Sequence, residues 1–255
     1  MAGTNPGHLR FDPSACLTGT MTDDPSHRQG AFFGRRKGHP LRVRQADAFD
    51  TVLPRLALDL TAPAPADLAS LFPVPVDGVR IEIGFGGGEH LLAQTQLHPR
   101  TGFIGCEPFI NGMAKALAII DAQKIANIRL HAGDATDLIA WLPAASIARV
   151  DLLYPDPWPK RRHWKRRFVN DESVARLARI LKPGGEFRFA SDWANYADWT
   201  LLRLSRSPDF TWTAERADDW RKPWLEFTRT RYEAKALREG RTPCYLVFRR
   251  NDPSS

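Results

Sequence analysis

From residue 79 onward, short apolar runs alternate with segments in which apolar residues recur every three or four positions. The short runs are rich in Val, Ile, Leu and Phe and are bounded by turn-forming residues, which predicts strands, whereas the periodic segments predict helices. The expected strands open the segments 79–88, 102–107, 127–135, 149–159, 186–192 and 243–250, and the expected helices cover 89–98, 110–123, 136–143, 171–181 and 196–206. Strands that alternate with helices form βαβ units with right-handed crossovers, so we expect an α/β domain with a parallel sheet.

The chain before this region lacks the same regularity. Residues 1–30 are rich in Gly, Pro, Thr and Ser and show no period, so we expect a disordered extension. Residues 31–78 contain GRRKGHPLRVR at 34–44 and then many prolines, which predicts a basic arm and a linker. We expect the folded domain to cover 79–250 and a short tail to follow at 251–255.

Composition permits a sizeable core and favours an anionic partner. Of the 255 residues, 43% are hydrophobic and 25% are charged, which argues against global disorder. The net charge of +7 favours nucleic acid as the partner, although an ordinary basic protein would carry the same charge. The position of the positive charge along the chain therefore has to decide between the two.

The cysteines and the apolar runs indicate the compartment. Cys16, Cys106 and Cys244 are too far apart for a disulfide framework or a metal site, and His90 and His131 lack metal-ligand spacing. No apolar run approaches the roughly 18 residues that a membrane span needs, and the N-terminus lacks the apolar segment of a signal peptide. We expect a cytoplasmic protein without a metal.

Acidic residues close the predicted strands one after another. In open α/β sheets the ligands bind beyond the carboxyl ends of the strands, so side chains at those ends share one cleft. The residues at these ends are Glu82, Glu107, Asp134, Asp156 and Asp192. Their common position predicts a ligand site at this edge of the sheet.

The glycine-rich turn after the first strand, EIGFGGGEH at 82–90, raises the question of a dinucleotide. The dinucleotide fingerprint G-x-G-x-x-G needs a third glycine for close packing of helix on strand, and counted from Gly84 that position is Glu89. The fingerprint therefore fails, and an NAD-dependent oxidoreductase is the least favoured enzyme class. Gly84 and Gly86 would still let a ligand lie tightly against the backbone.

The acids around this turn favour a different cofactor. Glu82 is a poor neighbour for a pyrophosphate but suits a cationic amine, because carboxylates accept charge-assisted hydrogen bonds from ammonium groups. Glu107 is placed to bind a ribose diol, and Asp134 is placed to meet the amino edge of an adenine. An amine, a ribose and an adenine without a required phosphate site describe S-adenosylmethionine.

The fourth strand runs into LYPDPWPKRRHWKRR at 153–167, which combines a restrained carboxylate with a basic run. Pro155 and Pro157 fix their own φ angles and restrict the residues before them, so Asp156 is held in place, and Trp158 is available to stack on a base. The basic run contains Lys160, Arg161, Arg162, Lys165, Arg166 and Arg167, with His163 and Trp164 among them. Cations interleaved with aromatic rings favour single-stranded or splayed RNA, whereas the plain alternative is a solvated basic loop whose tryptophans cap the core.

These stretches resemble the bacterial tRNA (guanine-N(7)-)-methyltransferase family. The resemblance rests on EIGFGGGEHL, GCEPFINGMAKAL, DLLYPDPWPKRRHWKRRFVN, LKPGGEFRFASDW and TRTRYEAKALREGRTPCYLVFRR, within residues 30–250. It implies a Rossmann-like, S-adenosylmethionine-dependent methyltransferase fold with a mostly parallel, doubly wound sheet and a late antiparallel strand. The implied reaction is methyl transfer from S-adenosylmethionine to N7 of a guanine in the tRNA variable loop.

The resemblance also implies roles for single residues. The cofactor would be contacted by Glu82, Glu107, Asp134 and Asp156, in addition to Gly84 and Gly86 of the turn, and Asp156 would also be the catalytic residue. The substrate would be bound by Lys160, Asp192, Thr230, Arg231, Tyr232 and Glu233, and RNA would contact Arg162, His163, Trp164, Lys165, Arg166 and Arg167. From the residues alone, a helix N-cap before Trp193 is the plain alternative for Asp192, and Arg231 and Glu233 indicate only a polar turn.

Two other kinds of function stay open at this point. A methyltransferase that acts on a protein or a small molecule would keep the cofactor acids but would not depend on the basic run at 160–167. A non-catalytic RNA-binding protein with a vestigial fold would have no need of an intact set of acids. The expected partner is tRNA, no membrane partner is expected, and a monomer is compatible with the sequence.

Overall fold

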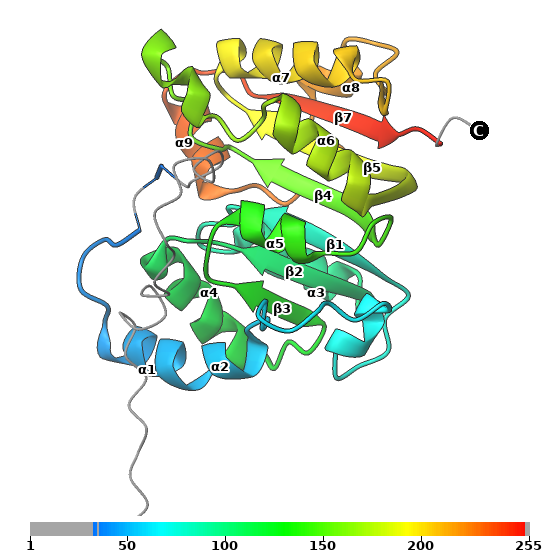
Figure 1. The fold of residues 1–255 in the computed structure, drawn as a ribbon. Helices are drawn as coiled ribbons and strands as arrows, with labels where there is room; N and C mark the ends of the chain where they lie inside the picture. The colour runs from blue at the N-terminus through cyan, green and yellow to red at the C-terminus, as the bar shows by residue number, and fades with distance from the viewer. Residues whose placement is uncertain (1–32, 35, 253–255) are drawn as a thin grey trace, which may run out of the picture.

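A computed structural model of the protein describes residues 33–34 and 36–252. In this part of the chain seven strands form one sheet in the order β3-β2-β1-β4-β5-β7-β6, and Figure 1 shows it with β7 near the top and β3 near the bottom. The strands are β1 Gly78–Ile83, β2 Thr101–Cys106, β3 Ile128–His131, β4 Ile147–Leu153, β5 Leu181–Ser191, β6 Phe210–Trp212 and β7 Cys244–Arg250. The extension expected at 1–30 and the end of the tail expected at 251–255 lie outside the described residues.

The sheet is parallel except at β7. Strands β1 to β5 pair in parallel with their neighbours, whereas β7 runs antiparallel to both β5 and β6. The chain winds outward from β1 through β2 to β3 and then returns to begin β4 on the other side of β1. The strand order therefore reverses between β1 and β4, where open α/β sheets bind their ligands. The expected mostly parallel sheet with a late antiparallel strand is confirmed, while β6 has no counterpart in the sequence pattern.

Helices cover both faces of this sheet. The helices are α1 Val43–Thr51, α2 Leu53–Leu56, α3 Glu89–Leu97, α4 Ile110–Gln123, α5 Ala135–Trp141, α6 Asp171–Ile180, α7 Ala194–Arg206, α8 Asp218–Arg221 and α9 Arg231–Arg238, with 3-10 turns at η3 Leu68–Leu71 and η4 Arg161–Arg166. Side chains of successive strand residues point to opposite faces, so Phe103 of β2 packs with α1 to α4 and its neighbour Ile104 packs with α5 to α7. The helices expected at 89–98, 110–123, 136–143, 171–181 and 196–206 all form.

The sequence KPGG at 182–185 is typical of a turn, but in the structure these residues are part of β5. The pairing register of β4 with β5 shifts between Ile147, which faces Leu181, and Arg149, which faces Glu186, so the intervening residues bulge out of the strand. Gly184 takes a φ of 74°, which side chains rarely adopt, and a Cβ on Gly185 would lie 2.8 Å from the carbonyl oxygen of Lys182. The glycines thus make a bulge that the sequence pattern alone presents as a turn.

Part of the segment at 31–78 packs on the sheet and its helices. Ala48 and Leu53 are buried in the cluster that contains α4, and the N–H of Leu58 donates to the carbonyl oxygen of Leu130 in β3 at 2.9 Å. Trp141 Nε1 donates to the carbonyl oxygen of Ala62 at 2.7 Å. These contacts hold the chain before β1 against the edge of the sheet that β3 forms.

Candidate functional site

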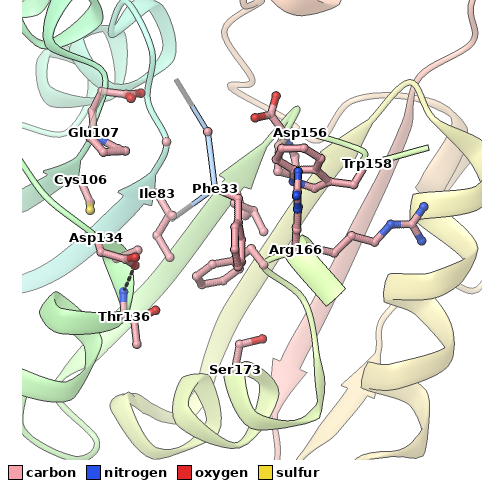
Figure 2. A pocket seen from close by; sticks show the side chains of 18 of the residues that line it. Phe33, Ile83, Cys106, Glu107, Asp134, Thr136, Asp156, Trp158, Arg166 and Ser173 are labelled. Atoms are coloured by element: carbon pink, nitrogen blue, oxygen red, sulfur yellow. Dashed lines mark hydrogen bonds between the residues drawn. The ribbon is translucent and has the colours of Figure 1, made fainter. Parts of the chain in front are cut away.

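A cavity of about 390 Å³ lies beyond the carboxyl ends of β1, β2, β3 and β4. Its volume is within the range of roughly 300–1,000 Å³ that is typical of small-molecule sites. Figure 2 shows Glu107 and Asp134 on one side of it, Asp156, Trp158 and Arg166 on the other, and Phe33 between the two groups. Three of the strand-end acids expected to share a cleft therefore do share one.

The floor of the cavity includes the glycine turn between β1 and α3. Gly84, Gly86 and Gly88 have φ values of 71°, 58° and 81°, a region that residues with a Cβ rarely occupy. Helix α4 packs tightly against this turn, because a Cβ on Gly112 would lie only 2.3 Å from the carbonyl oxygen of Gly86. The turn thus presents bare backbone to the cavity, held from below by a helix that also lacks a side chain at the contact.

Glu107, directly after β2, connects two loops at the cavity by hydrogen bonds, the glycine turn after β1 and the loop after β2. Its Oε2 accepts a hydrogen bond from the N–H of Gly86 at 2.5 Å, and its Oε1 accepts one from the N–H of Phe109 at 2.8 Å. The side chain is 6% exposed, and this burial raises the pKa of Glu107, although the two N–H donors favour its charged form. Each carboxylate oxygen keeps a further lone pair, which suits hydroxyl donors of a ligand.

Asp134 lies at the start of α5, on the same side of the cavity. Its carboxylate accepts a hydrogen bond from the N–H of Thr136 at 2.8 Å, which is drawn as a dashed line in Figure 2. This is the bond of a helix N-cap, and it fixes the direction of the side chain. The residue therefore has a structural role in capping α5, and it lines the same cavity as Glu107.

Glu82 does not line the cavity. It is one residue before Ile83, which does line it, and successive side chains of a strand point to opposite faces of the sheet. The Glu82 carboxylate lies 2.7 Å from Nδ1 of His90, and both side chains are buried. Burial raises the pKa of Glu82. The structure thus separates this acid from the other strand-end acids.

The loop after β4 carries Asp156 to the mouth of the cavity. Tyr154 and Trp158 have φ values of 50° and 44°, and a side-chain residue in this left-handed region costs about 1–3 kcal/mol. Pro155 and Pro157 further restrict the backbone conformations that the loop can adopt. The Asp156 side chain is exposed, yet the protein atoms around it raise its pKa through partial loss of hydration. A strained and stiff loop therefore holds one carboxylate at the rim.

The basic run folds into η4, and its side chains separate into an outer and an inner set. The outer set is exposed and consists of Lys160, Arg161, Arg162 and Lys165. Arg166 lies over two rings at the cavity, with its Cζ 4.9 Å from the centroid of Trp158 and 5.4 Å from that of Phe33. Arg167 is only 1% exposed and does not belong to the surface that RNA would meet, because aromatic side chains enclose it.

The residues expected to bind substrate lie in different settings. Tyr232 lines the cavity, and a Cβ on Gly86 would lie 3.2 Å from both Tyr232 and the guanidinium of Arg231. Asp192 pairs with Nε of Arg241 at 2.5 Å. Lys160, exposed at the surface, does not line the cavity.

Thr230 and Glu233 are buried at the start of α9. The hydroxyl of Thr230 accepts a hydrogen bond from the N–H of Glu233 at 3.1 Å, which caps the helix. The Glu233 carboxylate accepts hydrogen bonds from the hydroxyl of Tyr245 and from Nε of Arg229. These two residues therefore hold α9 in place while Tyr232, between them, faces the cavity. The pattern Thr-x-x-Glu is a helix-start signal that predicts α9 in place of a polar turn.

The lining also contains residues for which the sequence pattern predicts no site role. They include Phe33, Phe109, Ser173 and Arg176. Ser173 follows Asn170 at the spacing of a capping box, in which each side chain accepts from the backbone N–H of the other at 2.9 Å. That spacing predicts the start of α6 at this place but not its position beside the cavity, and no sequence signal marks Phe33.

The described residues contain no group of three or more His, Cys, Asp or Glu side chains arranged to hold a metal ion. Within the same residues, no helix combines the length and the apolar character that crossing a membrane requires.

The chain is similar to known methyltransferases over most of its length. A family model described as "Putative methyltransferase" matches residues 77–246. The tRNA (guanine-N(7)-)-methyltransferase of Rhodopseudomonas palustris (strain BisB5) is 63% identical over 224 residues, which cover 88% of this chain and 88% of that protein. The protein of the same name from Nitrobacter hamburgensis (strain DSM 10229 / NCIMB 13809 / X14) is 63% identical over 244 residues, which cover 96% of each chain.

One solved structure, that of the 16S rRNA methyltransferase KamB, is similar in fold. It matches with a TM-score of 0.51 at 14% identity and covers 69% of this chain and 89% of that one. At this identity the likeness concerns the fold alone. Together with the strand order, it confirms the methyltransferase fold expected from the sequence.

Proposed function

The chain belongs to the tRNA (guanine-N(7)-)-methyltransferase family, and we infer that it transfers a methyl group from S-adenosylmethionine to N7 of a guanine in tRNA. We propose the variable loop as the place of that guanine. The observation that carries the proposal is the cavity at the switch point of the sheet, which Glu107, Asp134 and Asp156 all line. The basic surface of η4 adjoins the same cavity through Lys165 and Arg166.

The chemistry of the lining suits the cofactor. Glu107 keeps lone pairs for the hydroxyls of a ribose, and Gly86 adds no side chain of its own between a ligand and the backbone, while Arg231 and Tyr232 lie beside it. Asp134 suits the amino edge of an adenine, and the apolar side chains of Ile83 and Ile139 suit the faces of its ring. Glu82 is left out of the proposed contacts, because its carboxylate bonds to His90 outside the cavity.

The reaction asks for positioning and for stabilisation of charge. When bound, S-adenosylmethionine supplies a methyl group on a sulfonium, so that a sulfur–carbon bond breaks as a nitrogen–carbon bond forms. Guanine N7 has an in-plane lone pair and no proton, so no base is needed to expose it. The purine ring becomes cationic as it is methylated, and a fixed carboxylate beside it stabilises that charge. Asp156, at the rim of the cavity, is the residue we assign to this task.

The exposed cations of η4 supply the contact with RNA. Lys160, Arg161, Arg162 and Lys165 are exposed on the segment that follows the Asp156 loop, so phosphates bound there bring the nucleotide to the cavity mouth. Trp158 lies at the same mouth with its ring edge-on to His163 at 5.9 Å between centroids. A base turned out of the tRNA fold can stack on such a ring.

The proposal is tested by methylation of bulk tRNA with S-adenosylmethionine labelled in its methyl group, followed by chemical cleavage at 7-methylguanine. Cleavage at one guanine of the variable loop supports the full proposal. Label at another position of tRNA overturns the site within tRNA, and label in no RNA overturns the substrate. A chain that shows no affinity for S-adenosylmethionine in a titration overturns the enzyme itself.

A further inference from the structure

Arg167 is the member of the basic run that RNA contact does not explain. Its side chain is 1% exposed, whereas Lys165 two positions earlier is open to solvent. A buried cation loses its hydration and is retained only where other groups replace the lost water. The groups that surround Arg167 therefore indicate what it does.

Three aromatic rings enclose its guanidinium. The Cζ of Arg167 lies 4.9 Å from the ring centroid of Trp164, 4.8 Å from that of Tyr196 and 5.0 Å from that of Trp199. Ring faces attract cations more strongly where water is excluded. Two of the rings are themselves fixed on Val169, whose N–H donates to the Tyr196 hydroxyl and whose carbonyl accepts from Trp199 Nε1. The cage, defined by Trp164, Tyr196 and Trp199, is thus a rigid holder for the cation.

From this cage Arg167 reaches the loop that carries Asp156. Its Nε donates to the carbonyl oxygen of Pro157 at 2.9 Å, and its Nη2 donates to Oδ1 of Asn195 at 2.7 Å. The planar guanidinium fixes both bonds at once, so the carbonyl of Pro157 is held relative to α7.

The loop has few donors of its own with which to hold itself. Pro155, Pro157 and Pro159 have no backbone N–H, so hydrogen bonds from these positions are excluded. The carbonyl that Arg167 binds belongs to the peptide between Pro157 and Trp158, and Trp158 has the unfavourable φ of 44°. The bond to Arg167 therefore holds in place a peptide that would otherwise relax by turning. Asp156 immediately precedes Pro157, whose carbonyl belongs to that peptide.

We propose that Arg167 is a positioning residue for methyl transfer, which holds the Pro157 carbonyl from its aromatic cage and thereby fixes Asp156 at the cavity mouth. The inference rests on the proposed function of Asp156. The same residue closes η4, since its N–H donates to the carbonyl oxygen of Trp164 at 3.0 Å. It thus links the segment assigned to RNA contact with the loop assigned to catalysis.

The test is steady-state kinetics on tRNA with the Arg167→Lys variant of the full chain. Lysine keeps the positive charge in the cage but has no planar fork with which to bind Pro157 and Asn195 together. We expect kcat to fall about 10- to 100-fold, as displaced catalytic groups commonly cause. The KM for tRNA and the dissociation constant for S-adenosylmethionine should change by less than about threefold, because Arg167, although it adjoins the cavity, is only 1% exposed and offers almost no surface to either ligand.

Arg203→Lys is the matched control. Arg203 lies over the ring of Trp199, with its Cζ 3.2 Å from the centroid, and pairs with Asp171 at 3.5 Å, yet no hydrogen bond joins it to the Asp156 loop among the residues that the structure describes. It is thus an arginine on the same cage without the bond under test. Its substitution should leave kcat unchanged. Asn195→Ala removes the acceptor of the hydrogen bond from Arg167 Nη2. It should lower kcat as Arg167→Lys does, but by a smaller factor.

Two results overturn the inference. One is an Arg167→Lys variant that keeps its kcat but loses tRNA affinity, because Arg167 would then act on RNA directly. The other is a crystal structure of that variant, or of Asn195→Ala if Arg167→Lys does not fold, with Asp156 in its wild-type place. The wild-type chain tests the proposed function separately: failure to methylate tRNA overturns that function, while the crystal structure still decides whether Arg167 holds the loop.

Discussion

Gly112 of α4 lies so close to Gly86 of the glycine turn that an added Cβ would be 2.3 Å from the Gly86 carbonyl oxygen. The turn is held on its other side by Glu107, which accepts the hydrogen bond of the Gly86 N–H at 2.5 Å. A helix and a carboxylate thus fix the turn between them. The backbone that the proposed cofactor would meet is preorganised by its neighbours and not by the turn alone.

Substitution of Gly112 should therefore weaken cofactor binding. In Gly112→Ala the new methyl group cannot be accommodated without a shift of the turn, since backbone atoms stand in its way. We expect the dissociation constant for S-adenosylmethionine to rise about tenfold or more in a calorimetric titration, equivalent to about 1.4 kcal/mol. Gly78→Ala is the control, because nothing lies within 4 Å of a Cβ at that position. Equal affinities in the two variants would mean that the turn does not bind the cofactor.

The carboxylate of Glu107 has two partners that glutamine cannot both keep. In Glu107→Gln one of the N–H donors, of Gly86 or of Phe109, faces an amide NH₂ group and loses its acceptor. A buried donor left without an acceptor costs about 1–3 kcal/mol, so the melting temperature should fall together with cofactor affinity. Calorimetric scans with and without S-adenosylmethionine measure both effects. An unchanged melting temperature would contradict the anchoring role.

The rate of methyl transfer should depend on pH through Asp156. Partial loss of hydration raises the pKa of this carboxyl above its usual range, so the charged form is lost at a higher pH than for a fully hydrated aspartate. If the ionised carboxylate stabilises the cationic ring, kcat/KM rises with pH through this pKa and then stays level. Asp156→Asn should lower the rate about 100-fold and abolish this acid limb of the pH profile. A variant whose lost activity returns at high pH would indicate base catalysis instead.

The exposed cations of η4 should contribute to tRNA affinity through the salt dependence of binding. Replacing Arg161 by alanine removes one phosphate contact, so the slope of log K against log salt concentration should fall by roughly one. The kcat at saturating tRNA should not change, because Arg161 does not line the cavity. Lys182→Ala is the control: Lys182 is also exposed but lies in the β5 bulge, toward the end of the strands that is opposite the cavity. If the wild type, Arg161→Ala and Lys182→Ala showed the same slope, η4 would not be part of the RNA interface.

Two roles of Asp192, a contact with the substrate and an ion pair with Arg241, can be separated by substitution. It pairs with Arg241 at 2.5 Å, and both side chains are partly exposed, so the pair should contribute about 1 kcal/mol or less to stability. We expect Asp192→Asn to lower kcat/KM by more than the loss of folded protein explains, and the melting temperature measures that loss. Arg241→Met breaks the same pair and serves as the comparison. If both variants lose activity equally, Asp192 acts only by holding Arg241.

The edge of the sheet that carries the site was predictable, because parallel strands bring their carboxyl ends together whatever the rest of the chain does. Glu107, Asp134 and Asp156 follow from that rule. Glu82 does not, since helices cover both faces of β1 and the sequence pattern is apolar on either side of the residue. Which face an acid within such a strand points to depends on the packing of α3, where His90 is located.

Arg167 shows a second limit of sequence-based prediction. Within a run of cations the natural expectation is a solvated side chain, and nothing in the run itself separates Arg167 from Arg166. The difference comes from Tyr196 and Trp199 on α7, which tertiary folding brings to the end of η4. The helix α9, in contrast, carried its own signal in the capping pair Thr230 and Glu233.

The central claim is that the methyl group goes to N7 of guanine, and a tRNA transcript containing 7-deazaguanosine in place of guanosine tests it most directly. This base keeps its Watson–Crick edge and its stacking surface but has a carbon at position 7. The measurement is incorporation of labelled methyl in a single turnover, beside a filter-binding assay that shows equal binding of the two transcripts. We expect rapid labelling of the guanosine transcript and none of the 7-deazaguanosine transcript. Equal labelling of both would contradict it.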